Sequence, residues 1–162
     1  TQALRKQYRD QASAFNKQIS AYDLVTPFPI TTPTENTLKT YERYHDVKDL
    51  ELTIEILTQK FPEMATSAQE VLVSETCYYC NMTIMRRNLF DEYCHYLFSI
   101  CFEFENHRDL SKYTNDPTKY PGGQTRVLGF LGERLTNIFI HHVKKTRPHL
   151  KFLEMPFAFL KE

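Results

Sequence analysis

Residues 124–143 read QTRVLGFLGERLTNIFIHHV, and this stretch indicates how the chain folds. Its large apolar residues recur at three- and four-residue steps, which is the period of an α-helix. Pro148 follows shortly afterwards, and a proline cannot continue a helix because it lacks the backbone N–H. We therefore expect a helix from about residue 124 to 143 with an inward face made of Leu128, Leu131, Leu135, Ile138, Phe139 and His142.

The opposite side of this expected helix is partly polar. Arg126, Phe130, Glu133 and Asn137 fall within one narrow stripe that points away from the apolar face. A carboxylate held on a rigid helix can accept a proton from a hydroxyl group, and a guanidinium can offset the charge of a phosphate. The alternative is a solvated helix face with ordinary charge pairs, and periodicity alone favours that alternative.

Strand and helix patterns alternate through the rest of the chain. Such alternation is typical of an α/β layer, and here helix predominates and the strands are few and short. The length of 162 residues fits one domain, so we expect a single domain over residues 1–162. The expected helices cover residues 1–22, a segment after Thr34, 47–61, 62–73 and a segment after Asn88, and the expected strands cover 23–26, 76–85 and 150–157.

Local signals set several of these boundaries. Thr34 and Asn88 are candidate N-caps for the helices that follow them, and Asp46 can cap the helix after it. Residues 76–85, TCYYCNMTIM, are rich in strand formers and are expected to be one strand that is buried on at least one face. The polar stretch 106–123 ends in Pro-Gly-Gly, which is typical of a surface loop.

Composition excludes several classes of function. The 20 basic residues balance the 20 acidic residues, so the chain lacks the positive surface that nucleic acid binding requires. No apolar run is long enough to cross a bilayer, and no signal-peptide pattern follows Thr1. We expect a cytoplasmic protein, with peripheral association at the inner face of the membrane as a further option. Because the chain starts with Thr rather than Met, we also expect residues upstream.

The four cysteines suit a reducing compartment rather than a disulfide scaffold. Cys77-x-x-Cys80, with Cys94 and Cys101, raises the question of a zinc site. Positions three apart on a strand point to opposite faces, and the later two cysteines lie within an apolar helix stripe. Buried free thiols are the simpler interpretation, and we predict no metal site in this chain.

A group of polar residues precedes the helix of 47–61. Tyr41, His45 and Asp49 stand at four-residue intervals, so one continuous helix would place them on one face, where an imidazole could bond a sugar or phosphate. If Asp46 instead interrupts the helix as a cap, Asp49 only completes that cap. The interrupted arrangement is the favoured one from the residues alone.

Asn81 and Met82 form the last candidate group. An Asn in an apolar strand must be hydrogen-bonded or face a ligand, and strand ends are where α/β sheets present ligand contacts. A purely structural bond to the backbone is an equal alternative. The chain holds no Asp-x-Asp and no Gly-rich phosphate loop, so if a nucleotide-sugar and a divalent ion are bound, residues beyond this chain contribute or the ion is dispensable. It also holds no Gly-x-Ser-x-Gly elbow and no catalytic Cys/His motif, so hydrolase functions lose their usual support.

Four blocks of sequence cover nearly all of the chain after Ala21: Tyr22-Asp-Leu-Val-Thr-Pro27; Tyr41-x-x-x-His45-x-x-x-Asp49-Leu50; Cys80-Asn-Met-Thr-Ile-Met85 leading through Leu89-Phe-Asp-Glu-Tyr-Cys94 to Leu97-Phe98; and Arg126-Val-Leu-Gly-Phe-Leu-Gly-Glu-Arg-Leu135. In these blocks and their order the chain resembles a family of bacterial proteins of capsular polysaccharide and lipopolysaccharide synthesis, whose shared domain is of unknown function and glycosyltransferase-like.

The resemblance implies the carboxyl-terminal part of a GT-A-like glycosyltransferase. The family's amino-terminal, nucleotide-binding half with its Cys-His-Tyr-Arg-Arg motif has no counterpart here. The implied partners are a nucleotide-sugar donor and a glycan or lipid-linked glycan acceptor, with no cofactor in this chain and a divalent cation only together with the missing half. The alternative is a non-catalytic module that binds carbohydrate or an assembly partner. The implied roles are a general base for Glu133, phosphate or sugar contacts for Arg126 and Arg134, and substrate-pocket positions for Asn81, Met82, Tyr41, His45 and Asp49.

Overall fold

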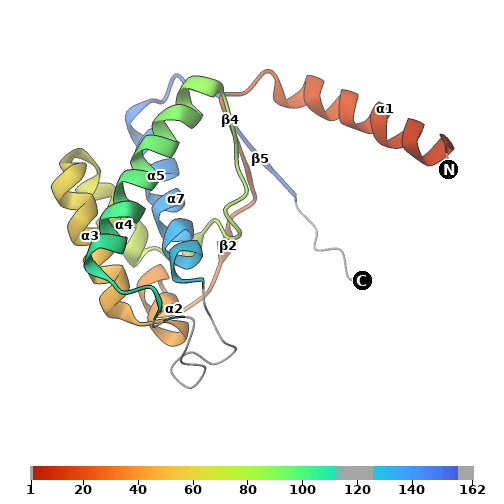
Figure 1. Ribbon diagram of the computed structural model, residues 1–162. Helices are drawn as coiled ribbons and strands as arrows, with labels where there is room; N and C mark the ends of the chain where they lie inside the picture. The colour runs from red at the N-terminus through yellow and green to blue at the C-terminus, as the bar shows by residue number, and fades with distance from the viewer. Residues whose placement is uncertain (1, 112, 114–125, 157–162) are drawn as a thin grey trace.

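The computed structural model describes residues 2–111, 113 and 126–156. Helices dominate it, and the strands are short, so the predicted helix-rich α/β class is confirmed (Figure 1). Within these residues no helix is both long and apolar enough to cross a bilayer. The helices are α1 (Gln2–Ile19), α2 (Thr37–Tyr44), α3 (Val47–Lys60), α4 (Ala65–Val73), α5 (Arg87–His107) and α7 (Val127–Thr146), with a 3-10 turn at Pro62–Met64. The strands are β1 (Leu24–Pro27), β2 (Ile30–Thr31), β3 (Thr76–Cys77), β4 (Ile84–Met85) and β5 (Phe152–Met155).

Helix α7 is the centre of the fold. It packs against α3, α4 and α5, and its side chains are buried around most of its circumference. Leu135, Ile138 and Phe139 have no solvent exposure, and Phe139 meets the rings of Tyr93 and Tyr96 on α5. Each fully buried apolar side chain of this size stabilises the fold by about 1.5–3 kcal/mol. The predicted apolar face of α7 is therefore part of the core.

A three-stranded sheet has β1 in its middle. Strand β1 pairs antiparallel with β4, where Val25 lies opposite Ile84, and parallel with β5, where Thr26 lies opposite Glu154. The pairing with β4 ends at Val25, whereas the pairing with β5 continues to Pro27. The chain before β4 therefore diverges from β1 beside Thr26.

The predicted strand over residues 76–85 is wrong in its middle. Only its two ends are strands: β3 pairs with β2 in a separate two-stranded sheet, and β4 joins the main sheet. Between them Cys80 and Asn81 have positive φ angles of 74° and 49°, which no strand residue adopts. Strand propensity describes local side-chain preference, and contacts from α7 override it here.

Two predicted caps are also wrong. Thr34 has a φ of 71°, and the cap of α2 is Asn36, whose Oδ1 accepts from the Lys39 N–H at 2.9 Å. Asn88 lies inside α5, which starts after Arg86 without a side-chain cap. The predicted loop over 106–123 starts too early because α5 continues to His107, and residues 114–123 lie outside the described residues.

Helix α1 confirms the predicted amino-terminal helix and leads away from the helical body (Figure 1). It ends at Ile19, and a salt bridge between Arg86 Nε and Asp23 Oδ1 at 2.6 Å ties the following turn to the start of α5. Its Phe15 is more than one-third exposed and lies against the main sheet at the pocket described below. The final predicted strand is shorter than expected, starting at Phe152.

Candidate functional site

The turn formed by residues 78–81 is the structural centre of the candidate site. Consecutive left-handed conformations at Cys80 and Asn81 are unfavourable for residues with a Cβ, by about 1–2 kcal/mol each. Asn tolerates this region better than most residues, because its short polar side chain can bond locally. The rest of the fold must therefore hold the turn in place.

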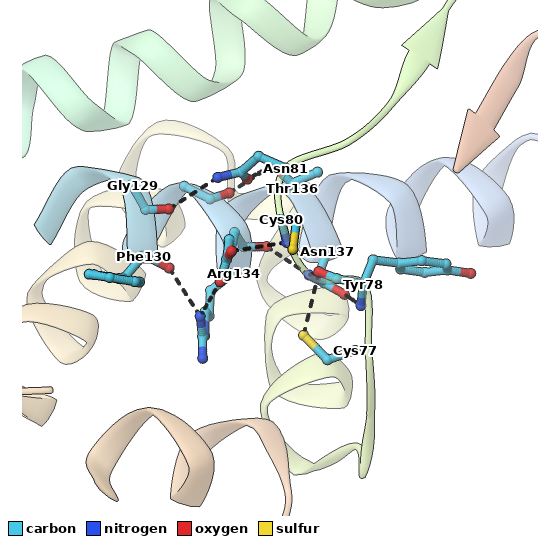
Figure 2. A network of polar contacts seen from close by, with 11 residues as sticks. Cys77, Tyr78, Cys80, Asn81, Gly129, Phe130, Arg134, Thr136 and Asn137 are labelled. Carbon is cyan, nitrogen blue, oxygen red and sulfur yellow. Dashed lines mark hydrogen bonds and ion pairs between the residues drawn. The ribbon is translucent and has the colours of Figure 1, made fainter. Parts of the chain in front are cut away.

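Side chains of α7 hold the turn's backbone (Figure 2). Asn137 accepts from the Tyr78 N–H at 2.6 Å and donates to the Tyr78 carbonyl at 2.6 Å. Glu133 Oε1 accepts from the Cys80 N–H at 2.9 Å. These bonds satisfy backbone groups that have no strand partner at this point, so the polar stripe of α7 bonds protein rather than solvent.

The side chain of Asn81 is itself fixed on α7. Its Nδ2 donates to the Gly129 carbonyl at 3.1 Å, and its Oδ1 lies 3.0 Å from the Thr136 hydroxyl. That hydroxyl also lies 2.7 Å from the Gly132 carbonyl and 2.8 Å from the Tyr93 hydroxyl. Since Thr136 has one hydroxyl proton, the two acceptors share it, and Tyr93 donates to the Thr136 oxygen. Thr136 was not a sequence candidate, because no sequence pattern connects it with Asn81.

Arg134 is buried beside this network. Its NH1 group donates to Glu133 Oε2 at 2.8 Å, and its side chain is only 4% exposed. The guanidinium lies 5.2 Å from the centre of the Tyr41 ring and 5.9 Å from that of Tyr79, which are distances of cation–π contact. Among the described residues its Nε has no hydrogen-bond partner.

The expected outward orientation of the polar stripe is therefore wrong for most of its length. Asn137 is 3% exposed, and Glu133 is 16% exposed at its side chain. The reason is that the turn of residues 78–81 crosses this side of α7 and covers it. Arg126 is different, because it precedes the first residue of α7 and is exposed.

The group of Tyr41, His45 and Asp49 has the interrupted arrangement. Helix α2 ends at Tyr44, and Asp46 caps α3 by accepting from the Lys48 N–H at 3.0 Å. One continuous helix face does not exist here. The fold nevertheless brings the three side chains together by joining two helices at an angle.

These three side chains line one small recess next to α7. The His45 ring stacks on Phe130 at 4.3 Å and meets Tyr41 at 4.7 Å between ring centres. The recess has a volume of about 10 Å³, and Asp49 is 3% exposed at its wall. This volume accommodates about one water molecule and no sugar ring.

A larger pocket opens where β4 diverges from β1. It has a volume of about 350 Å³, which is within the range of small-molecule sites. The candidates Asn81 and Met82 both line it, so the structure places these two at a pocket. Its other walls are mainly apolar, with two hydroxyl side chains, and consist of Phe15, Val25, Thr26, Pro27, Thr83, Ile84, Met155 and Pro156.

The cysteines lie on different elements. Cys77 is buried, and burial raises the pKa of its thiol to about 11, so it stays protonated at neutral pH. Cys80 is exposed in the turn, whereas Cys94 and Cys101 lie on α5. The described part of the chain contains no group of three or more side chains that could hold a metal ion.

No curated protein matches the chain. The apo structure of the bifunctional glycosyltransferase WbbM is similar, with a TM-score of 0.76 and 27% sequence identity over 87% of this chain. The aligned region is 24% of the WbbM chain, so this chain spans about a quarter of that protein's length. The fold therefore matches part of a glycosyltransferase structure.

A family model also matches the sequence directly. It covers residues 2–145 and is described as Domain of unknown function (DUF4422). The matched range contains the turn of residues 78–81 and the polar side chains of α7 that hold it. Because the match extends over most of the chain, this protein belongs to the DUF4422 family.

Proposed function

We propose that this chain is part of a glycosyltransferase that transfers a sugar from a nucleotide-sugar donor to a growing capsule, exopolysaccharide or lipopolysaccharide glycan. The observation that carries the proposal is the similarity to part of WbbM, with a TM-score of 0.76 over 87% of the chain. A second support is the position of Asn81 and Met82 at a pocket of about 350 Å³.

The pocket beside Asn81 is the proposed place of the sugar. The two bonds that fix the Asn81 amide leave one N–H and one lone pair for a ligand. The exposed thioether of Met82 offers an apolar contact for the C–H face of a ring. A pre-positioned amide favours binding because the ligand does not have to order it.

Glu133 is the proposed general base. In the reaction an acceptor hydroxyl would attack the anomeric carbon, the bond to the donor phosphate would break, and the hydroxyl proton would pass to the carboxylate. The nucleoside diphosphate would leave with the bonding electrons. Glu133 has one bond on each oxygen and part of its side chain open to solvent, so each oxygen keeps a lone pair for this proton.

The other candidates have supporting roles in this proposal. Arg126 is exposed at the start of α7 and would approach a donor phosphate. Arg134 is buried against the Tyr41 ring, so its charge would act on the substrate without direct contact. His45 and Asp49 would shape the wall beside Phe130 rather than enclose a sugar, because the recess there is about 10 Å³.

A divalent cation would need ligands from outside this set of residues. The lining of the Asn81 pocket includes hydroxyl and amide groups but no carboxylate or imidazole. Magnesium and manganese ions prefer carboxylate oxygens, so the described pocket does not fit such an ion. Most of the donor nucleotide would likewise be bound by the amino-terminal half of the complete enzyme.

A second candidate function is a carbohydrate- or partner-binding module without catalysis. It is favoured by the bonds of Glu133, whose two oxygens already hold Cys80 and Arg134. In that case the carboxylate is only a structural contact of the turn.

Ligand-dependent melting temperatures separate the two functions. A ligand that binds only the folded state raises the melting temperature, and the rise grows with the logarithm of the ligand concentration once that concentration exceeds the Kd. A concentration-dependent rise with UDP-glucose or UDP-galactose, together with transfer by the full-length protein, is the result expected for the enzyme. A rise with free oligosaccharide, none with either nucleotide-sugar and no transfer by the full-length protein would instead support the binding module.

A further inference from the structure

A second pocket is lined by Tyr78, at the start of the turn, and not by Asn81. It has a volume of about 670 Å³ and is bounded by α4, α7 and the chain from Ser74 to Tyr78. Of the residues of the candidate site described above, Tyr78 and Asn137 also belong to its lining. Its side chains combine one aromatic ring with charged groups: Glu70, Tyr78, His141, Lys144 and Lys145.

Tyr78 is a rigid wall of this pocket. Asn137 holds its backbone, and its hydroxyl donates to Glu154 Oε1 at 2.5 Å. Lys144 Nζ donates to the same hydroxyl and to the same carboxylate oxygen, each at 2.7 Å. The ring is therefore fixed at both ends while its side chain stays partly open. Lys144 Nζ lies 5.1 Å from the ring centre, so a ligand would stack on the part of the ring that this ammonium leaves open, at little entropic cost.

A carboxylate and an ammonium that also line the pocket lie side by side. Lys145 Nζ donates to both oxygens of Glu70, at 2.6 and 2.8 Å, and His141 Nε2 lies 3.6 Å from Glu70. Each Glu70 oxygen keeps lone pairs, and the ammonium keeps a third N–H. An acceptor and a donor in this arrangement match two neighbouring hydroxyl groups, one of which donates while the other accepts.

The charges of the pocket favour a neutral ligand. Each of the two lysines has its own carboxylate partner, Glu70 for Lys145 and Glu154 for Lys144. Glu70 lines the pocket, and Glu154 pairs with Lys144 from outside the lining. A phosphate or uronate would therefore compete with these carboxylates for both ammonium groups, which weakens the attraction of the pocket for an anion.

We propose that this pocket is a second carbohydrate site that binds a neutral sugar unit through a vicinal diol, with stacking on Tyr78 and hydrogen bonds to Glu70 and Lys145. The site is separate from the Asn81 pocket and does not depend on which residues carry out transfer. It would hold a unit of a glycan at a distance from the reacting end.

The test uses methyl α-D-glucopyranoside and methyl β-D-galactopyranoside as probes, with their fully O-methylated forms as diol-free controls. Binding is measured by saturation-transfer NMR on the wild-type protein and on Glu70→Gln and Lys145→Met. Glu103→Gln is the matched control variant, because Glu103 is also a partly exposed carboxylate and pairs with Lys60 at 3.1 Å outside the pocket.

The expected result is that the wild-type protein and Glu103→Gln bind at least one free glycoside, that both pocket variants bind it about tenfold more weakly, and that O-methylated probes do not bind. Equal binding by Glu70→Gln, no binding of either glycoside by the wild type, or binding of inorganic phosphate in place of the glycosides would each overturn the proposal. The melting-temperature shift with UDP-glucose or UDP-galactose, measured on the same variants, reports separately on the proposed transferase function.

Discussion

The side-chain amide of Asn137 forms a two-way hydrogen-bonded pair with the backbone of Tyr78, with both distances at 2.6 Å (Figure 2). Through this pair a residue of α7 holds a residue that lies 59 positions earlier in the chain. The pair anchors Tyr78, which lines one pocket, at the start of the turn that carries Asn81, which lines the other.

Asn137→Ala should lower the free energy of unfolding by about 2–4 kcal/mol, because the buried N–H and carbonyl of Tyr78 lose their partners. Urea unfolding followed by circular dichroism measures the change. Asn88→Ala is the control, since Asn88 is exposed at the start of α5, and it should stay within about 0.5 kcal/mol of wild type. An equally small change for Asn137→Ala would contradict the conclusion that Asn137 stabilises the turn through the Tyr78 backbone.

Substitutions of Asn81 should rank in a specific order. Its φ of 49° suits Gly, whereas Ala pays about 1 kcal/mol for this conformation. Both variants lose the bonds to Gly129 and Thr136. We expect the melting temperature to be highest for wild type, lower for Asn81→Gly and lowest for Asn81→Ala. A higher melting temperature for the Ala variant than for the Gly variant would refute the left-handed conformation at Asn81.

Glu133→Gln in the full-length enzyme should abolish transfer while the fold remains intact, because the amide can still accept from the Cys80 N–H but cannot take a proton from the acceptor hydroxyl. Glu133→Ala should in addition lower stability, as Cys80 loses its partner. Turnover and thermal unfolding are measured on both variants. Near-normal turnover of the Gln variant would leave Glu133 as a structural contact only.

Stability should fall in acid through Glu154. Burial alone would raise the pKa of this carboxyl, but the hydrogen bonds from Lys144 and Tyr78 outweigh burial and hold its pKa below the ordinary value of 4.5. A carboxyl with a lowered folded-state pKa contributes stability above the unfolded-state pKa, and this contribution is lost as the pH falls through the folded-state pKa.

The measurement is the urea midpoint between about pH 6 and pH 3. Lys144→Met should be less stable near pH 6 and should lose less stability than wild type on acidification. Lys39→Met, at an exposed position of α2, is the control and should keep the wild-type pH dependence. An unchanged pH dependence in Lys144→Met would rule out the contribution of this pair.

We expect Asp49 to contribute mainly to the stability of the fold. Its Oδ1 accepts from the Tyr113 hydroxyl at 2.7 Å and from Arg108 Nε at 3.2 Å. Asp49→Ala should cost about 2–3 kcal/mol, because two donors lose a buried acceptor. A double-mutant cycle with Tyr113→Phe should show that the two effects are not additive, and strict additivity would exclude direct coupling.

The sequence alone determined the helical parts of this protein. Apolar residues at helical spacing identified α1, α3 and α7, and Asp46 identified the start of α3, because these signals act within one or two turns of the chain. The helix-rich α/β class followed from the same patterns. The sequence also identified Asn81, with its neighbour Met82, as candidate site residues, because an amide within an apolar segment requires a hydrogen-bond partner. The local pattern did not identify that partner.

Only the tertiary structure decided how the polar stripe of α7 is used. Helical periodicity shows that Glu133 and Asn137 share a direction, but it cannot show whether water or another segment lies there. The fold places the turn of residues 78–81 on that stripe, which breaks the predicted strand and buries Arg134. Long-range hydrogen bonds from α7 to Tyr78, Cys80 and Asn81 outweigh local strand propensity here, because together they offset the cost of a left-handed turn.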